Sequence, residues 1–130
     1  MKKEINDVET FHATFKAPVG NRKEPHLIPD ERAELRYSLI YEELEEYKKA
    51  CKEGNIVEIA DALGDILYVT FGSIVEHGLQ DKIIDVFNEI QASNMSKLDE
   101  NGKPIFREDG KILKGPNYFK PDIKKIIEEE

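Results

Sequence analysis

The stretch from Ile56 to His77 constrains the fold of this chain more than any other. At about 100° per residue on a helix, its apolar side chains point to nearly all sides, and Gly78 follows it as a natural stop. A helix that is apolar all round is normally buried in the centre of a helical protein. We therefore expect an all-α fold, an antiparallel bundle of four to five helices, with this helix at its centre.

Three acidic side chains interrupt the apolar pattern of this stretch. Glu58, Asp61 and Asp65 fall within one sector of about 60° on the helix. Buried carboxylates are rare without partners, and three on one line cannot all ionise unless cations hold them. The pattern therefore indicates a cation or metal at this face.

A second pair of acids lies on the preceding helix, which we expect from Glu31 to Lys52 with Asp30 as its N-cap. Glu43 and Glu46 share one sector beside Leu39 and Ala50, so they border the apolar face rather than oppose it. Two explanations fit this pattern. Either the acids hold a metal, or Arg32 or Arg36 on the same stripe neutralises them.

The short Glu53-Gly54-Asn55 break between the two helices predicts that they run antiparallel. At about 1.5 Å per residue, Glu43 or Glu46 is then level with Asp61 and Asp65. Facing acidic stripes would bring four or five carboxylates together. An all-oxygen cluster suits Mg²⁺, with Mn²⁺ as an alternative, and such sites commonly serve phosphoanhydride hydrolysis.

The flanking segments supply weaker signals. Residues 5–15 have helical spacing, and His12 on this stretch is a candidate for a pocket wall. A third long helix is expected from Asp81 to about Lys97. Two short runs around Glu108-Asp-Gly110 predict a small hairpin, and a short helix is expected after Pro121-Asp122.

Composition limits the classes of function. The chain of 130 residues suits one domain, with a core over 30–97 and a C-terminal extension over 98–130. A net charge of −8 with no basic block argues against a nucleic acid polymer as partner. Cys51 is a single cysteine and is expected as a small core residue. Because no apolar run reaches membrane length, no membrane partner and a cytoplasmic location are expected.

The spacing Glu42-Glu43-x-x-Glu46, then Glu58-x-x-Asp61 and Asp65-Ile-Leu-Tyr, resembles the all-α nucleoside triphosphate pyrophosphohydrolases. This superfamily includes the MazG proteins, the dimeric dUTPases and phosphoribosyl-ATP pyrophosphohydrolase. The resemblance covers about residues 30–97. Further runs resemble a MazG-like subgroup: Ser93-Asn-Met-Ser-Lys-Leu, Lys114-Gly-Pro-Asn-Tyr and Pro121-Asp122.

The resemblance implies hydrolysis of an NTP or dNTP to the monophosphate and pyrophosphate, in the service of nucleotide-pool house-cleaning. Mg²⁺ is the implied cofactor, and a homodimer or homotetramer is the implied assembly. By position, Glu43 and Glu46 would be metal ligands, and Glu42 would orient or deprotonate the attacking water. Asn94 and Lys97 would bind substrate, together with Lys114, Tyr118 and His12.

The ligands of the second helix stay open between Glu58/Asp61 and Asp61/Asp65. Glu58-x-x-Asp61 matches the ExxD pattern directly, whereas Asp65 precedes the Ile-Leu-Tyr run as the family acid does. Ala62 stands where relatives of that second type carry Glu. Two other functions also stay open, namely a non-catalytic helical oligomer with a structural acidic network and phosphoribosyl-ATP hydrolysis.

Overall fold

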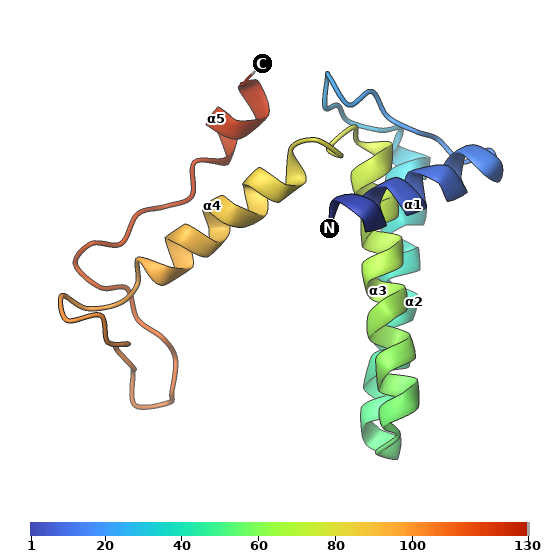
Figure 1. Ribbon diagram of the computed structural model, residues 1–130. Helices are drawn as coiled ribbons and strands as arrows, with labels where there is room; N and C mark the ends of the chain where they lie inside the picture. Colours follow the sequence, from blue (N-terminus) through green and yellow to red (C-terminus); the bar gives the residue numbers. More distant parts are fainter. Residues whose placement is uncertain (130) are drawn as a thin grey trace. The chain divides into compact units, whose positions relative to one another are not determined.

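The computed structural model describes residues 1–129 and is all-helical, as the sequence predicts. Figure 1 shows the five helices of the described chain. Their bounds are α1 Lys2–Thr14, α2 Asp30–Glu53, α3 Ile56–Glu76, α4 Ile83–Met95 and α5 Ile123–Glu128.

The chain consists of two compact units, Met1–Asp81 and Lys82–Glu130. The first unit contains α1, α2 and α3, and the second contains α4, α5 and the long segment between them. The division therefore precedes α4, whereas the sequence predicts a core that continues to residue 97.

The antiparallel α2–α3 pair is the main body of the first unit (Figure 1). Gly54 ends α2 in the left-handed conformation, with φ 64° and ψ 32°, which glycine adopts without steric cost. Asn55 then caps α3, because its side-chain oxygen accepts hydrogen bonds from the backbone N–H groups of Val57 (3.1 Å) and Glu58 (3.2 Å). Two residues thus reverse the chain and fix the register of the two helices.

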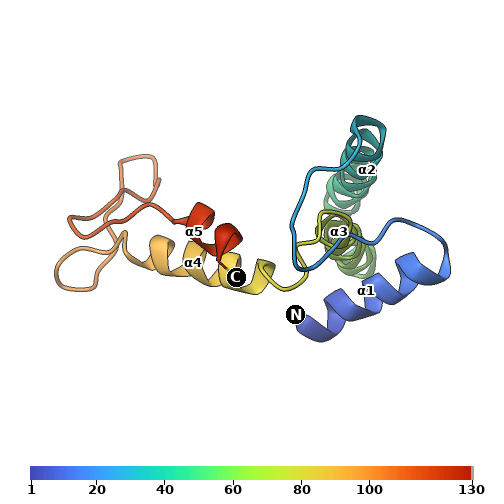
Figure 2. The same ribbon diagram turned by 90° about the horizontal axis from the view of Figure 1, so that it is seen from above.

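Helix α1 packs against the other side of α3, so that α3 lies between α1 and α2 (Figure 2). Ile5 and Val8 of α1 are buried with Ile74 and Val75 of α3. The loop before α2 joins this layer, because the N–H of Gly20 donates to the Val75 carbonyl at 2.8 Å. The core of the unit therefore lies around the C-terminal half of α3.

A buried ionic network centres on Glu76, whose residue is only 1% exposed. Arg32 donates to both carboxylate oxygens of Glu76, at 3.0 and 2.7 Å, and Arg36 donates to Oε2 at 3.1 Å. Arg36 also reaches the Val69 carbonyl at 2.7 Å. His12 Nδ1 donates to the Pro18 carbonyl at 2.9 Å and lies 3.9 Å from Glu76 Oε2. The network ties α1, α2 and α3 together.

In the second unit, the segment after α4 folds back onto the end of that helix. Ser93 Oγ donates to the Phe119 carbonyl at 2.8 Å, and the N–H of Phe119 donates to Ser96 Oγ at 3.2 Å. The predicted hairpin is reduced to a single antiparallel bridge between Phe106 and Ile112, and residues 1–129 form no longer strand. The turns at residues 99–102 and 107–110 are held instead by Asp99 and Asp109.

Three expectations about burial and capping are wrong. Apolar residues of α3 are not covered on all sides, since Ile56 is 72% and Leu67 57% exposed. Cys51 is exposed rather than part of the core. Asp30 is the first helical residue, and Pro29 occupies the N-cap position without a side-chain hydrogen bond.

None of the helices in residues 1–129 has the length and apolar character needed to cross a bilayer.

Candidate active site

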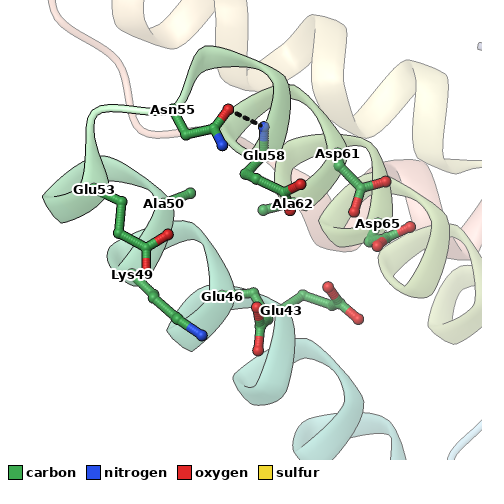
Figure 3. Close-up of a pocket in the computed structure, with 10 residues that line it drawn as sticks. All are labelled: Glu43, Glu46, Lys49, Ala50, Glu53, Asn55, Glu58, Asp61, Ala62 and Asp65. Atoms are coloured by element: carbon green, nitrogen blue, oxygen red, sulfur yellow. Dashed lines mark hydrogen bonds between the residues drawn. The ribbon is translucent and has the colours of Figure 1, made fainter.

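A pocket of about 510 Å³ opens between α2 and α3 beside their connecting loop, and Figure 3 shows its lining residues. This volume is within the usual range for small-molecule sites. All five predicted metal ligands line it, Glu43 and Glu46 from α2 and Glu58, Asp61 and Asp65 from α3. The other lining residues are Lys49, Ala50, Glu53, Asn55 and Ala62.

Small residues let the two helices approach each other at this pocket. Ala50 and Ala62 are each 3% exposed and lie among the lining residues. The acids flank these alanines on the same helix faces, since Glu46 precedes Ala50 by one turn and Asp65 follows Ala62 by three residues. The close approach at the alanines therefore leaves the longer acidic side chains along the edges of the contact.

The carboxylates of the pocket repel one another. The pKa of Glu43 is raised above its usual value, first by burial and then by the negative charges of Asp65, Glu46 and Asp61. None of the five acids forms an ion pair with any residue in 1–129. The pocket therefore concentrates negative charge, and Lys49 is the one cationic side chain among its lining residues.

The alternative in which Arg32 or Arg36 neutralises these acids is wrong. Both arginines bind Glu76, a full eleven residues beyond Asp65 on α3. Hydrogen bonding to Glu76 raises the pKa of Arg32, whereas burial lowers the pKa of Arg36. Because both guanidinium groups donate to Glu76, neither arginine neutralises the acids of the pocket.

The donor set fits a hard divalent cation. Its side chains offer carboxylate oxygens, which suit Mg²⁺ and Mn²⁺ rather than zinc. Within residues 1–129, no three His, Cys, Asp or Glu side chains already lie close enough to share one ion. Glu46, Glu58 and Asp61 are exposed, so their side chains are free to rotate toward a common cation. All three candidate acids of α3 line the pocket, so the pairs Glu58/Asp61 and Asp61/Asp65 both remain possible as the ligands from this helix.

Two predicted site residues lie outside this pocket. Glu42 is exposed on α2 and does not line it. His12 is 3% exposed, and its contacts are with Pro18 and the Glu76 network. The structure therefore gives His12 a packing position in the core of the first unit.

The remaining predicted substrate-binding residues gather in the second unit. Lys114 Nζ lies 4.8 Å from the centre of the Tyr118 ring, a cation–π arrangement. Gly115 packs so closely on the backbone of Lys97 and Leu98 that a Cβ there would overlap with the Leu98 carbonyl. Asn94 is exposed one turn earlier, at the end of α4. Asn94, Lys97, Lys114 and Tyr118 therefore share one neighbourhood.

Sequence reasoning missed three pocket residues, Lys49, Glu53 and Asn55. Lys49 is three residues after Glu46, so its helical position already placed it near the acidic stripe. Asn55 was assigned only to the break between the helices, although an N-cap asparagine between two acidic stripes is close to both. The Glu76 ion pairs were also missed, because they join residues 40 or more positions apart.

Comparison with known proteins agrees with this fold. The family profile described as phosphoribosyl-ATP pyrophosphohydrolase matches residues 8–94, more than half of the chain. The chain is 33% identical over 127 residues to the uncharacterized protein L479 of Acanthamoeba polyphaga mimivirus. That alignment covers 93% of this chain but 46% of the viral protein, so the chain spans about half the length of that relative.

A solved structure is also similar, that of a proposed NTP pyrophosphohydrolase from Exiguobacterium sp. 255-15. It matches with a TM-score of 0.51 and 26% sequence identity, over 95% of this chain and 93% of the other. The fold and the acidic helix pair thus define a MazG-like helical protein. The chain belongs to the phosphoribosyl-ATP pyrophosphohydrolase family, within the all-α NTP pyrophosphohydrolase superfamily.

Proposed function

We propose that this protein is a Mg²⁺-dependent nucleotide pyrophosphohydrolase that converts an NTP or dNTP to the monophosphate and pyrophosphate. The observation that carries the proposal is the gathering of six carboxylates in one pocket, the five predicted ligands and Glu53, without an ion pair to any described residue. Such a site attracts divalent cations, and phosphates bind to divalent cations that keep open positions. The family membership and the solved relative support the same class of reaction.

The reaction adds water across the bond between the α- and β-phosphates. The water oxygen bonds to the α-phosphorus, the bridging P–O bond breaks, and pyrophosphate leaves with the electron pair. A bound divalent cation would supply charge neutralisation for the phosphates. Since Glu42 lies outside the pocket lining, the water proton passes to one of the lining carboxylates in this proposal.

The proposed metal ligands are Glu43 and Glu46 from α2 and Glu58, Asp61 and Asp65 from α3. Short side-chain rotations are required to bring these oxygens to one cation, because they line the pocket as separate groups. The proposed substrate contacts are Asn94, Lys97, Lys114 and Tyr118 of the second unit. Their positive and aromatic groups have the chemistry that phosphates and bases require.

Phosphoribosyl-ATP is the second candidate substrate. It is favoured by the description of the family profile that matches residues 8–94. It differs from an ordinary NTP in its base and carries the same triphosphate chain. The same carboxylate pocket therefore serves either reaction, and substrate preference decides between them.

Assembly as a homodimer or homotetramer in the cytoplasm completes the proposal. Several apolar side chains of the helix pair are exposed, among them Ile56, Leu63 and Leu67. A helix that is apolar on nearly all sides is normally buried, so these side chains need a cover. A second copy of the chain would cover them. The exposed thiol of Cys51 is compatible with a reducing compartment. The physiological role proposed is removal of unwanted nucleotides.

The test is pyrophosphate release from a panel of canonical and modified NTPs and dNTPs and phosphoribosyl-ATP, with Mg²⁺ present. We expect release from at least one of them and a loss of about 100-fold or more in Glu46→Gln, which removes one anionic ligand. Glu45→Gln is the matched control, because Glu45 is exposed on the same helix and does not line the pocket. Orthophosphate release, or an active Glu46→Gln variant, would refute the proposal.

A further inference from the structure

Lys49 carries the positive charge in the pocket. Among the lining residues, all of which belong to the described chain, no other has a cationic side chain. Lys49 lies three residues after Glu46 and four before Glu53 on its own helix, yet it forms no ion pair with any of residues 1–129. Its ammonium group is therefore available to an anionic ligand.

Asn55 offers a second donor at the same end of the pocket. Its Oδ1 is occupied by the N–H groups of Val57 and Glu58, as the dashed line in Figure 3 indicates for Glu58. The cap fixes the orientation of the amide, and its nitrogen keeps two N–H donors without a partner in residues 1–129. Cap geometry therefore holds a neutral donor in the same pocket as the charged one.

These two donors give the pocket a direction. Lys49 and Asn55 lie at the end next to the α2–α3 loop, whereas Asp65 and Glu43 lie further along the helix pair. Asn55 and Asp65 are ten residues apart on α3, a rise of about 15 Å. A triphosphate is anionic along its whole length, so its phosphates that lie beyond the metal-binding acids need donors of this kind.

We propose that Lys49 and the side-chain amide of Asn55 bind the pyrophosphate end of the substrate. The triphosphate then runs toward the α2–α3 loop, and the nucleoside lies toward Asp65 and the following turn of α3. Lys49 would neutralise the charge that develops on the leaving pyrophosphate when the bridging P–O bond breaks. This inference rests on the proposed pyrophosphohydrolase function and assigns two positions in its site.

The test is isothermal titration of the full chain with inorganic pyrophosphate in the presence of Mn²⁺. We expect Lys49→Gln to weaken pyrophosphate binding about tenfold or more, since a hydrogen bond to a charged group is lost. Asn55→Asp should weaken it similarly while the helix melts as in the wild type, because aspartate is an equally good N-cap. Nucleoside monophosphate should bind both variants as it binds the wild type.

Lys48→Gln is the control, because Lys48 is the exposed neighbour of Lys49 and does not line the pocket. If Lys49 only offsets the acids, Lys49→Gln will change Mn²⁺ affinity and leave pyrophosphate affinity unchanged, which overturns the inference. Pyrophosphate binding by Asn55→Asp at wild-type strength overturns the part assigned to Asn55. A wild-type protein that releases pyrophosphate but fails these comparisons refutes this inference alone, whereas an inactive wild type refutes the proposed function.

Discussion

At the scale of single residues, Glu76 and the pocket acids have opposite environments on one helix. Glu76 is buried and accepts hydrogen bonds from Arg32 and Arg36, whereas Asp61 and Asp65 have no cationic partner among residues 1–129. Breaking a buried pair by removing one member typically costs about 3–5 kcal/mol. The arginines are therefore committed to stability, and the unpartnered acids are left for binding.

Gly72 is the residue that makes this pairing possible. A Cβ at Gly72 would overlap with the guanidinium of Arg36 and lie 3.0 Å from His12 Nε2. We expect Gly72→Ala to lower the free energy of unfolding by about 1–3 kcal/mol, because Arg36 must leave its hydrogen bonds to Val69 and Glu76. Thermal and urea unfolding of the variant measure the change.

Gly64→Ala on the same helix is the matched control. Nothing lies within 4 Å of a Cβ at Gly64, so the alanine should stabilise α3 by up to about 1 kcal/mol through helix propensity. Equal effects at Gly64 and Gly72 would contradict the role given to the Arg36 contact.

Five of the six pocket acids were predictable from sequence, whereas Glu53 and the Glu76 network were not. Helical spacing alone places Glu43 with Glu46 and Glu58 with Asp61 and Asp65. The partner of Glu76 depends on how side chains from α1 and α2 meet α3, which spacing within one helix does not specify. Cys51 failed for a related reason, because the apolar stripe of α2 is broader than the part that α3 covers.

At the scale of the helix pair, the pocket brings like charges together and so destabilises its own metal-free state. The pKa of Glu43 is raised, so the folded state holds this proton more tightly than the unfolded state. As the pH rises through the usual pKa of Glu43 and then through its raised pKa, the ionising carboxylate lowers the stability of the folded state. This loss of stability persists at neutral pH. A divalent cation should reverse this effect.

We expect Glu43→Gln to raise the melting temperature of the metal-free protein at pH 7. The matching gain in the free energy of unfolding should be no more than about 1 kcal/mol. With saturating Mn²⁺ the order should invert, since the wild type gains stabilisation from binding and the variant loses a ligand. Calorimetric melts from pH 4 to pH 8, with and without Mn²⁺, measure both effects. Glu45→Gln should follow the wild type throughout, and an unchanged Mn²⁺ response in Glu43→Gln would contradict the assignment.

Helix ends were predicted well where the chain carries a clear signal. Gly54 ends α2 within one residue of the expected position, and Asn55 begins α3. The third long helix is shorter than expected at both ends, at Ile83–Met95. The hairpin around Phe106 and Ile112 reduced to one bridge, because aspartate turns and side-chain contacts hold that segment without a ladder.

At the scale of the whole molecule, the outward face of α3 is the feature that calls for a partner. Ile56, Leu63 and Leu67 follow one another at spacings of seven and four, so they form one exposed apolar stripe. Sequence reasoning expected these side chains to be buried, and the helices of the first unit leave them exposed. The proposed homo-oligomer accounts for the difference.

We expect light scattering coupled to gel filtration to give at least twice the mass of 15.0 kDa for the wild type. The double variant Leu63→Glu with Leu67→Glu should shift the protein toward the monomer, because charges replace the apolar stripe. Lys48→Glu, on an exposed position of α2, serves as the control for added negative charge. A monomeric wild type would contradict the proposed homo-oligomer.

The two-residue connection at Gly54 and Asn55 has a consequence for how such a site can change over time. One inserted residue carried into α3 would turn that helix by about 100° and advance it by about 1.5 Å relative to α2. Glu58, Asp61 and Asp65 would then face away from Glu43 and Glu46 although every acid remained. The length of this turn is therefore inherited together with the chemistry in descendants of this chain.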